Sequence, residues 1–348
     1  MTDLNIRKSG KTGRITFTRP KALNALSYQM SLDIEAALDD WALDDDVTML
    51  VIDAAGEKAF CAGGDIADIY AAGTKGDYAF GQKFWADEYR MNAKMFAFPK
   101  PVATFMQGFT MGGGVGVGCH GSHRVVGDSS QIAMPEVGIG LVPDVGGSYI
   151  LAKAPDRFGE YLGLTAARMG AADAILAGFA DYYIPEALWP ELIMQLEHTG
   201  NYKLIDAAAT PAPEGQLEAI RSDINMHFAG ETLADILRSL SNDPSEFTQK
   251  TLKVLNRNSP LSMACALELI HRNRGATELR TALQQEYRFT YRALEKSDLI
   301  EGIRAAIIDK DRNPQWQHSL EALPTFEVTQ MLLPLGKAAL TFEKEEHA

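Results

Sequence analysis

Two carboxylates, Glu136 and Asp144, lie in the apolar, glycine-rich segment MPEVGIGLVPDVGGSY at residues 134–149. No lysine or arginine lies within this segment. Two acids in such surroundings can act as a general acid and base, or as a nucleophile and its proton shuttle. They can also be structural, with Glu136 in a loop after a strand and Asp144 capping a helix that begins near Val145. The segment alone does not decide between the two interpretations.

Two glycine-rich turns form the second chemical feature. AFCAGGDI (59–66) follows a predicted buried strand and precedes a predicted helix, and TMGGGVG (110–116) does the same after the strand in PVATFMQ (101–107). Glycines at such turns let backbone N–H groups approach a ligand closely, so two turns on neighbouring strands could form an oxyanion hole. For either turn alone, tight turns and close helix packing are the favoured explanation. The second turn lacks the GxGxxG spacing of a dinucleotide site.

Strands alternate with helices over the first 200 residues, which favours an α/β core with a largely parallel sheet. The pattern predicts a hairpin over 4–20, strands at 47–54, 101–107, 124–126 and 131–134, and helices over 27–45 and 78–98. After residue 200 the pattern is almost entirely helical. Residues 199–215 read as a connector, and helices are predicted over 258–275 and 276–298. We therefore expect a core at 1–200 and a helical C-terminal region at 201–348.

The composition indicates a soluble globular protein. The chain has 348 residues, 46% of them hydrophobic and 23% charged, and its net charge of −13 disfavours binding to nucleic acid or to an anionic membrane. Three scattered cysteines, no apolar signal segment and no long apolar run predict a cytoplasmic chain that crosses no membrane. His120 and His123 have metal-like spacing, but no acid or cysteine completes a ligand set, so we expect no metal.

Four motifs carry a resemblance to a known family. RPKALNALS (19–27), AFCAGGDI, GFTMGGGVG (108–116) and MPEVGIGLVPDVGG (134–147) occur in this order. Over residues 1–200 the chain resembles the enoyl-CoA hydratase/isomerase (crotonase) superfamily. The resemblance implies a spiral of ββα repeats and an acyl-CoA thioester substrate. It also implies that the N–H groups of Gly64 and Gly113 polarise the thioester carbonyl.

The resemblance is more specific around the two acids. Hydratases of this superfamily use two glutamates, whereas this chain keeps only Glu136 and has Gly116 at the other position. Asp144, the Glu88-Tyr89 pair and EGIRAAIIDKDRNPQW (301–316) resemble instead the branch that hydrolyses 3-hydroxyisobutyryl-CoA in valine degradation. That branch implies Glu136 as nucleophile or base, Asp144 as the residue that orients water or substrate, and Glu88 as the ligand of the 3-hydroxyl. No cofactor is implied, because coenzyme A belongs to the substrate.

Several alternatives remain open at this level. Enoyl-CoA hydration and dienoyl-CoA isomerisation are the competing activities, and the isomerases carry a Glu and an Asp at the same spacing. The candidates for binding the CoA phosphates are the local cations Arg19, Lys21 and Lys58, together with Ala22. Solvated surface explains the three cations equally well. A homo-oligomer is typical of crotonase relatives, but the helical C-terminal region could occupy the same surface.

Overall fold

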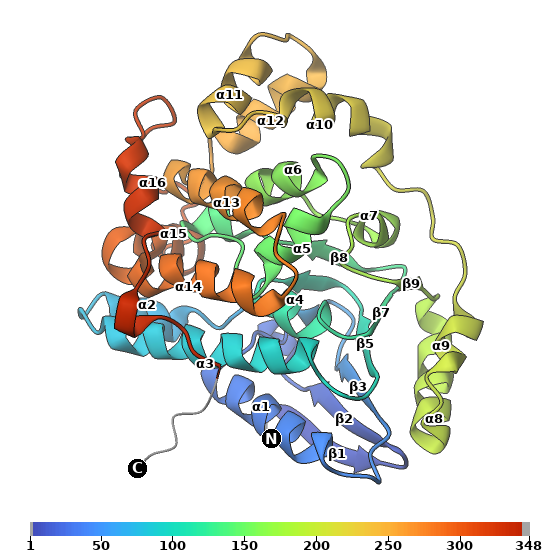
Figure 1. Cartoon of the computed structure of the whole chain (residues 1–348). Helices are drawn as coiled ribbons and strands as arrows, with labels where there is room; N and C mark the ends of the chain where they lie inside the picture. The colour runs from blue at the N-terminus through green and yellow to red at the C-terminus, as the bar shows by residue number, and fades with distance from the viewer. Residues whose placement is uncertain (1–2, 343–348) are drawn as a thin grey trace.

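The computed structural model describes residues 3–342, which form two sheets surrounded by helices (Figure 1). The larger sheet has the order β1-β2-β3-β5-β7-β9 and the smaller one β4-β6-β8. Every neighbouring pair is parallel except the β1–β2 hairpin. The strands are β1 (Leu4–Ser9), β2 (Thr12–Phe17), β3 (Met49–Ala54), β4 (Ala59–Cys61), β5 (Val102–Met106), β6 (Phe109–Met111), β7 (His123–Val126), β8 (Gln131–Ala133) and β9 (Tyr182–Tyr183).

Successive strands alternate between the two sheets. In the pairs β3/β4, β5/β6 and β7/β8, the first strand joins the larger sheet and the second joins the smaller one. This alternation is the ββα spiral that the sequence motifs imply, so the predicted α/β crotonase-like core is confirmed. The short strands β4 and β6 end at the two glycine turns, which places both turns at the same edge of the smaller sheet.

Helices make up most of the rest of the chain. The α-helices are α1 (Tyr28–Ala42), α2 (Ala67–Gly73), α3 (Tyr78–Phe96), α4 (Gly113–Gly118), α5 (Gly147–Lys153), α6 (Phe158–Thr165), α7 (Ala171–Leu176), α8 (Trp189–Thr199), α9 (Lys203–Ala208), α10 (Arg221–His227), α11 (Leu233–Ser241), α12 (Glu246–Leu255), α13 (Pro260–Asn273), α14 (Leu279–Lys296), α15 (Leu299–Ile303) and α16 (Thr325–Met331). Short 3₁₀ turns are η1 (Pro20–Ala22), η2 (Glu136–Ile139), η3 (Glu186–Leu188), η4 (Glu218–Ile220) and η6 (Gly336–Ala338), and η5 (Arg304–Ile308) is a π-helical turn.

The helix α3 is central to the site because it presents polar side chains to the interior. It begins at Asp77, whose side chain accepts a hydrogen bond from the Phe80 N–H, and it ends before Pro99 as predicted. It packs between α1 and α14 (Figure 1). Glu88, which lies on α3, is buried together with its neighbours, so this face of the helix carries an ionisable group inside the protein.

Two local predictions are wrong. The supposed connector contains the helix α9, whose Ile205 is buried against the outer face of the larger sheet. Asp144 does not cap the next helix, because α5 begins at Gly147 with Gly146 as its N-cap and no side chain capping it. Most of the other predicted strands and helices are found within a few residues of their expected bounds.

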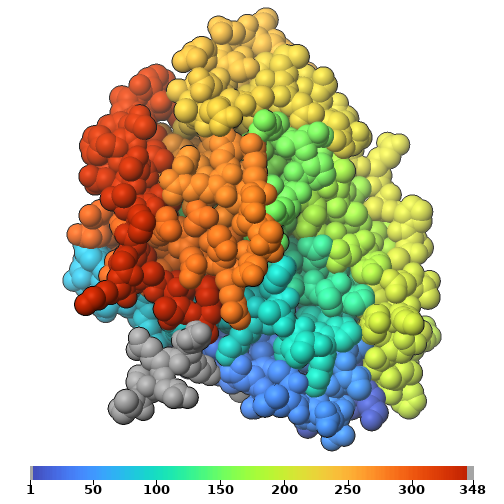
Figure 2. Space-filling model, in the orientation of Figure 1, coloured from blue at the N-terminus to red at the C-terminus, as the bar shows by residue number. Residues whose placement is uncertain are grey.

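The helices after residue 200 cover one side of the core. α13 packs on α5 and α6, and α14 packs on α3, so the C-terminal region shares its interior with the core. Figure 2 shows the orange and red C-terminal segments lying directly on the cyan and green ones. The division into a core and a C-terminal region at residue 200 stays a prediction. The last residues of the C-terminal region, 343–348, lie outside the described residues. Between residues 3 and 342, no helix has both the length and the apolar character needed to cross a membrane.

Candidate active site

The two glycine turns meet. β4 and β6 pair in parallel, and a Cβ placed on Gly114 would overlap the Cys61 carbonyl oxygen, so the turns touch backbone to backbone. A Cβ on Gly113 would lie 3.4 Å from the Gly64 nitrogen. Within residues 3–342, neither the Gly64 nor the Gly113 N–H has a hydrogen-bond acceptor. Two unpaired N–H groups this close together can bind one carbonyl oxygen.

Glu136 lies directly beside these turns. It is the first residue of η2, just after β8, and it is 4% exposed. Its Oε1 lies 2.9 Å from the position that a Cβ on Gly112 would take, and its Oε2 is buried without a hydrogen-bond partner among the described residues. Burial raises the pKa of Glu136 well above its usual value, and the negative charge of Asp144 raises it further. A buried carboxylate with a free oxygen is suited to proton transfer or attack.

Asp144 occupies the loop between η2 and α5, and the phenol of Tyr89 holds it. The Tyr89 O–H donates to Asp144 Oδ2 over 2.7 Å. Burial raises the pKa of Asp144 to about 7, although the hydrogen bond from Tyr89 acts in the opposite direction. The charge of Asp144 also raises the pKa of Glu136, so the ionisation of one acid affects that of the other.

Glu88 approaches the two glycine turns from α3. Its Oε1 lies 2.9 Å from where a Cβ on Gly113 would be, and this oxygen is also buried without a partner in the described chain. Burial, followed by the charge of Asp144, raises the pKa of Glu88 well above its usual value. The structure therefore brings Glu88, Glu136 and Asp144 to the turns of Gly64 and Gly113, while their catalytic roles stay predictions.

Position 116 has no room for a side chain. A Cβ on Gly116 would come within 2.6 Å of Asn92 Nδ2 and 2.9 Å of Val145 Cβ. Asn92 is fully buried, and its Oδ1 has no partner among residues 3–342. Asn92 and Tyr89 are polar residues that sequence analysis did not select as site residues. The signal was present, since Asn92 follows Glu88 by four residues and so lies on the same face of α3.

The candidates for binding the CoA phosphates separate into two groups. Lys21 and Lys58 line one surface cavity of ≈ 500 Å³ together with Leu23, and the exposed Ala22 lies beside them in η1. Arg19 does not line this cavity. Its guanidinium donates to Asp65 Oδ2 over 3.0 Å and to the Ala25 carbonyl over 2.9 Å. Arg19 is thus engaged in holding the loop after Gly64.

The two histidines have separate contacts. His120 is buried, and its Nε2–H donates to the Val145 carbonyl over 2.7 Å, while burial lowers its pKa to about 4. His123 stacks on Tyr182, with the ring centroids 5.9 Å apart. Residues 3–342 contain no group of three or more His, Cys, Asp or Glu side chains arranged to hold a metal ion.

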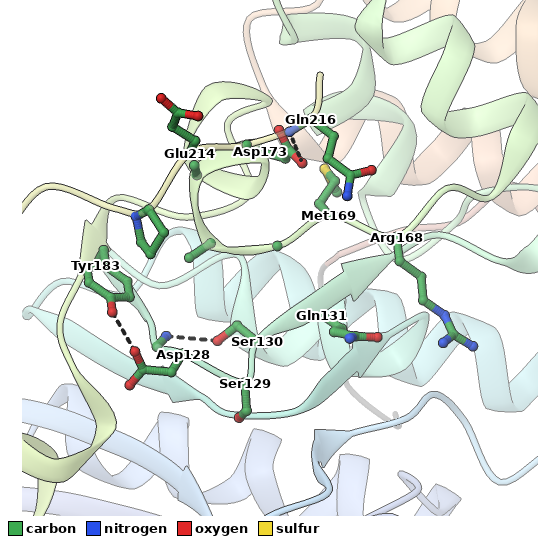
Figure 3. A pocket seen from close by; sticks show the side chains of 16 residues that line it. Asp128, Ser129, Ser130, Gln131, Arg168, Met169, Asp173, Tyr183, Glu214 and Gln216 are labelled. Carbon is green, nitrogen blue, oxygen red and sulfur yellow. Dashed lines mark hydrogen bonds between the residues drawn. The ribbon is translucent and has the colours of Figure 1, made fainter. Parts of the chain in front are cut away.

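A separate cavity of ≈ 490 Å³ lies between β8, α7 and the segment 213–216 (Figure 3). Two of its acids, Asp128 and Asp173, already have partners. Asp128 accepts from the Tyr183 hydroxyl over 2.6 Å, and Asp173 accepts from the Gln216 N–H over 3.0 Å. None of the predicted site residues lines this cavity, so it is distinct from the site at the glycine turns.

The fold and these turns define an acyl-CoA enzyme of the crotonase type, and comparison with known proteins agrees. Residues 12–332 match the family enoyl-CoA hydratase/isomerase. The chain therefore belongs to the enoyl-CoA hydratase/isomerase family. It is 35% identical over 347 residues to "3-hydroxyisobutyryl-CoA hydrolase, mitochondrial" of Gallus gallus, covering 96% of this chain and 89% of that protein. The human protein of the same name is 34% identical over 349 residues, covering 97% and 90%.

Solved structures confirm the fold over the full length. An enoyl-CoA hydratase from Rhodobacter sphaeroides 2.4.1 has a TM-score of 0.93 and 53% identity, covering 98% of this chain and all of that one. A carnitinyl-CoA dehydratase from Mycobacterium thermoresistibile has a TM-score of 0.94 and 38% identity, covering 99% of this chain and all of that one. The predicted resemblance to the 3-hydroxyisobutyryl-CoA hydrolases is confirmed by nearly full-length relatives, which include the helical C-terminal region.

Proposed function

We propose that this chain hydrolyses the thioester of 3-hydroxyisobutyryl-CoA to 3-hydroxyisobutyrate and CoA, a step of valine degradation. One observation carries the choice among the reactions of the family. Glu136 has a free, buried oxygen beside the two glycine turns, and the charge of Asp144 raises its pKa, whereas position 116 has no room for a second glutamate. The relatives named for this hydrolase activity support the same reaction.

The arrangement supplies what thioester hydrolysis needs. The N–H groups of Gly64 and Gly113 bind the carbonyl oxygen and stabilise its charge as the carbonyl carbon becomes tetrahedral. Glu136 either takes a proton from an attacking water or attacks the carbon itself, forming an anhydride that water then cleaves. CoA leaves as a thiolate, since a thiol pKa of about 8.5 requires little help from an acid. The reaction needs water and no cofactor.

Two other family reactions fit less well. Hydration of an enoyl-CoA needs one group to activate water and another to protonate carbon, and hydratases of the superfamily use two glutamates for this. Here Asn92 and Val145 fill the space at Gly116. The similar protein from Rhodobacter sphaeroides is named a hydratase, so hydration has to be measured. Dienoyl-CoA isomerisation shares the Glu136/Asp144 spacing, but hydrolase relatives match this chain over 96% of its length.

Thiol release distinguishes these reactions. With 3-hydroxyisobutyryl-CoA or 3-hydroxypropionyl-CoA, the protein is expected to release free CoA, measured with a thiol reagent, without added metal or nucleotide. Crotonyl-CoA should show little hydration, and a 3,5-dienoyl-CoA little formation of the conjugated diene. Thiol release should exceed both other signals by about tenfold or more, equivalent to ~1.4 kcal/mol of barrier. Rapid diene formation without thiol release would refute the hydrolase proposal.

Replacing Glu88 should erode selectivity for the 3-hydroxyl group. Glu88→Ala removes the free buried oxygen that we assign to the substrate hydroxyl, so the preference for 3-hydroxyisobutyryl-CoA over isobutyryl-CoA should fall by about 1–3 kcal/mol in kcat/KM. Glu88→Gln, which keeps the size and an acceptor oxygen, is the matched control and should retain more of the preference. Equal losses for both substrates would assign Glu88 to the integrity of the pocket instead.

Asp144→Asn should alter the pH profile as well as the rate. We expect kcat to fall at least ~10-fold, because the proposed orientation and proton transfer are lost. The charge of Asp144 raises the pKa of Glu136, so removing that charge lowers it. If ionised Glu136 is required, the rising acidic limb of kcat against pH should therefore move to lower pH in the variant. An unchanged limb would show that Glu136 does not titrate under the influence of Asp144.

The cellular setting is also a proposal. We infer a cytoplasmic site of action, supported by three buried cysteines that form no disulfide within residues 3–342. The names of the relatives place those proteins in mitochondria, so cell fractionation is the direct test. The proposed partner is the acyl-CoA substrate, and we propose binding to neither nucleic acid nor membrane. Formation of a homo-oligomer stays a prediction, which analytical ultracentrifugation can test.

A further inference from the structure

The backbone that carries Asp144 is strained. Val145, the next residue, has a φ angle of +52°, and Gly146 follows with +83°. A β-branched residue in this left-handed region costs on the order of 1–3 kcal/mol, so it persists only where its surroundings hold it. The direction of the Asp144 side chain depends on this loop, since α5 begins only one residue after Gly146.

A carboxylate from the C-terminal region holds the loop. Glu286 on α14 is fully buried, and its Oε2 accepts from the Gly146 N–H over 2.8 Å. Its Oε1 accepts from the Ser148 N–H over 3.1 Å and from the Ser148 hydroxyl. On the other side, His120 donates to the Val145 carbonyl. The strained residue is therefore fixed through its own carbonyl and through the next N–H group.

The same helix supports Asp144 from a second direction. Tyr89, whose hydroxyl donates to Asp144, also makes a hydrogen-bond contact of 3.4 Å with the hydroxyl of Thr290. Thr290 lies on α14 one turn after Glu286. α14 packs against both α3 and α5, so it contacts the helix that carries Tyr89 and the helix that follows the loop (Figure 1).

We propose that Glu286 is a positioning residue for the hydrolysis and acts through Asp144, by fixing the loop 144–148 in its strained conformation. The C-terminal helical region is then part of the active site and not an appendage of the core. Glu286 contacts the Gly146 N–H and Ser148. Its replacement should therefore lower kcat by displacing Asp144. Binding of the CoA ester should depend on it little.

Glu286→Gln tests the proposal. The amide nitrogen of glutamine cannot accept from the Gly146 N–H, so one of the three hydrogen bonds is lost while the volume is kept. We expect kcat to fall about 10- to 100-fold with KM changed less than about threefold, because small displacements of a catalytic group are costly. The decisive comparison is a double-mutant cycle with Asp144→Asn.

In the Asp144→Asn background, Glu286→Gln should add less than about a twofold loss, because the group on which Glu286 acts is already disabled. Equal fold losses in the two backgrounds would overturn the proposal. Glu160→Gln is the matched control: Glu160 is a buried glutamate on α6, ion-paired with Arg157, and it lies outside the catalytic groups. Its kcat should stay within about twofold of the parent value.

If Glu286→Gln does not fold, Ser148→Ala takes its place. This variant removes the hydroxyl that donates to Glu286 and that accepts from Asn273 Nδ2. A loss of kcat that disappears in the Asp144→Asn background would then support the proposal, and a parental kcat would overturn it. The inference rests on the proposed hydrolysis, but the two fail differently. A parent protein that releases no thiol refutes the function, whereas an active parent with additive losses refutes only the role of Glu286.

Discussion

Glu136→Gln is expected to lower kcat for thioester hydrolysis by about 10³-fold or more while the CoA ester still binds. Glutamine has nearly the same volume, so the pocket is kept. What is lost is the ability to take a proton or to attack carbon, and no other carboxylate faces Gly112 in the same way within the described residues. The rate should be measured as thiol release under saturating substrate, and binding by calorimetry with a non-hydrolysable thioether analogue.

The control separates catalysis from damage to the fold. Glu160→Gln removes a buried glutamate of α6 that has its own arginine partner, so its rate should stay near that of the parent protein. Glu136→Gln should melt at or above the parental temperature, because replacing a carboxyl whose pKa is raised by burial with a neutral amide removes a desolvation cost. A near-normal kcat in this variant would show that another group performs the attack.

Sequence analysis predicts those parts of the site whose residues lie close together in the sequence. The two glycine turns follow from glycines between a strand and a helix, and Glu136 and Asp144 lie in one short apolar segment. Parallel strands that end at the same edge of a sheet bring such turns together, so Gly64 and Gly113 could be expected to meet. The structure places them as neighbours because β4 and β6 pair directly.

The parts of the site that sequence analysis did not predict depend on contacts between segments that are far apart in the sequence. Tyr89 reaches Asp144 across 55 residues of sequence, and Glu286 reaches the Gly146 N–H across 140. No periodicity or spacing reports such a pair, since each partner looks like an ordinary residue on its own helix. The contact between Asn92 and Gly116 also joins distant segments, although the spacing of Asn92 from Glu88 did place it on the same face of α3. The helix α9 was not predicted for a different reason. It is short, and the prolines and alanines that follow it are typical of a linker.

Sequence analysis also did not predict the left-handed backbone at Val145, because a valine does not indicate a positive φ angle. Its cause lies in the partners that hold it, which come from α14 and from His120. His120 is one of the two histidines with metal-like spacing, and its Nε2–H donates to the Val145 carbonyl. Residues that support the loop thus come from both the core and the C-terminal region.

Gly113→Pro is expected to abolish most of the activity by deleting one of the two unpaired N–H groups at the glycine turns. Gly113 is the first residue of α4, a position where helices tolerate proline because the N–H has no intrahelical partner. The fold should therefore survive better than at an interior position. Loss of one oxyanion donor should lower kcat by about 10²- to 10³-fold, or ~3 kcal/mol of transition-state stabilisation.

Gly113→Ala is the control that separates the missing N–H from the added bulk. It keeps the donor but adds a Cβ 2.9 Å from Glu88 Oε1 and 3.3 Å from a methyl group of Leu26, as proline also does. The ratio of kcat between the two variants then measures the effect of replacing the N–H by the ring Cδ of proline, provided that circular dichroism shows both to be folded. An equal kcat in the proline and alanine variants would show that the Gly113 N–H does not bind the oxyanion. A large ratio would support that role, because both variants carry the Cβ and only proline replaces the donor by a Cδ that also occupies the place of the oxyanion.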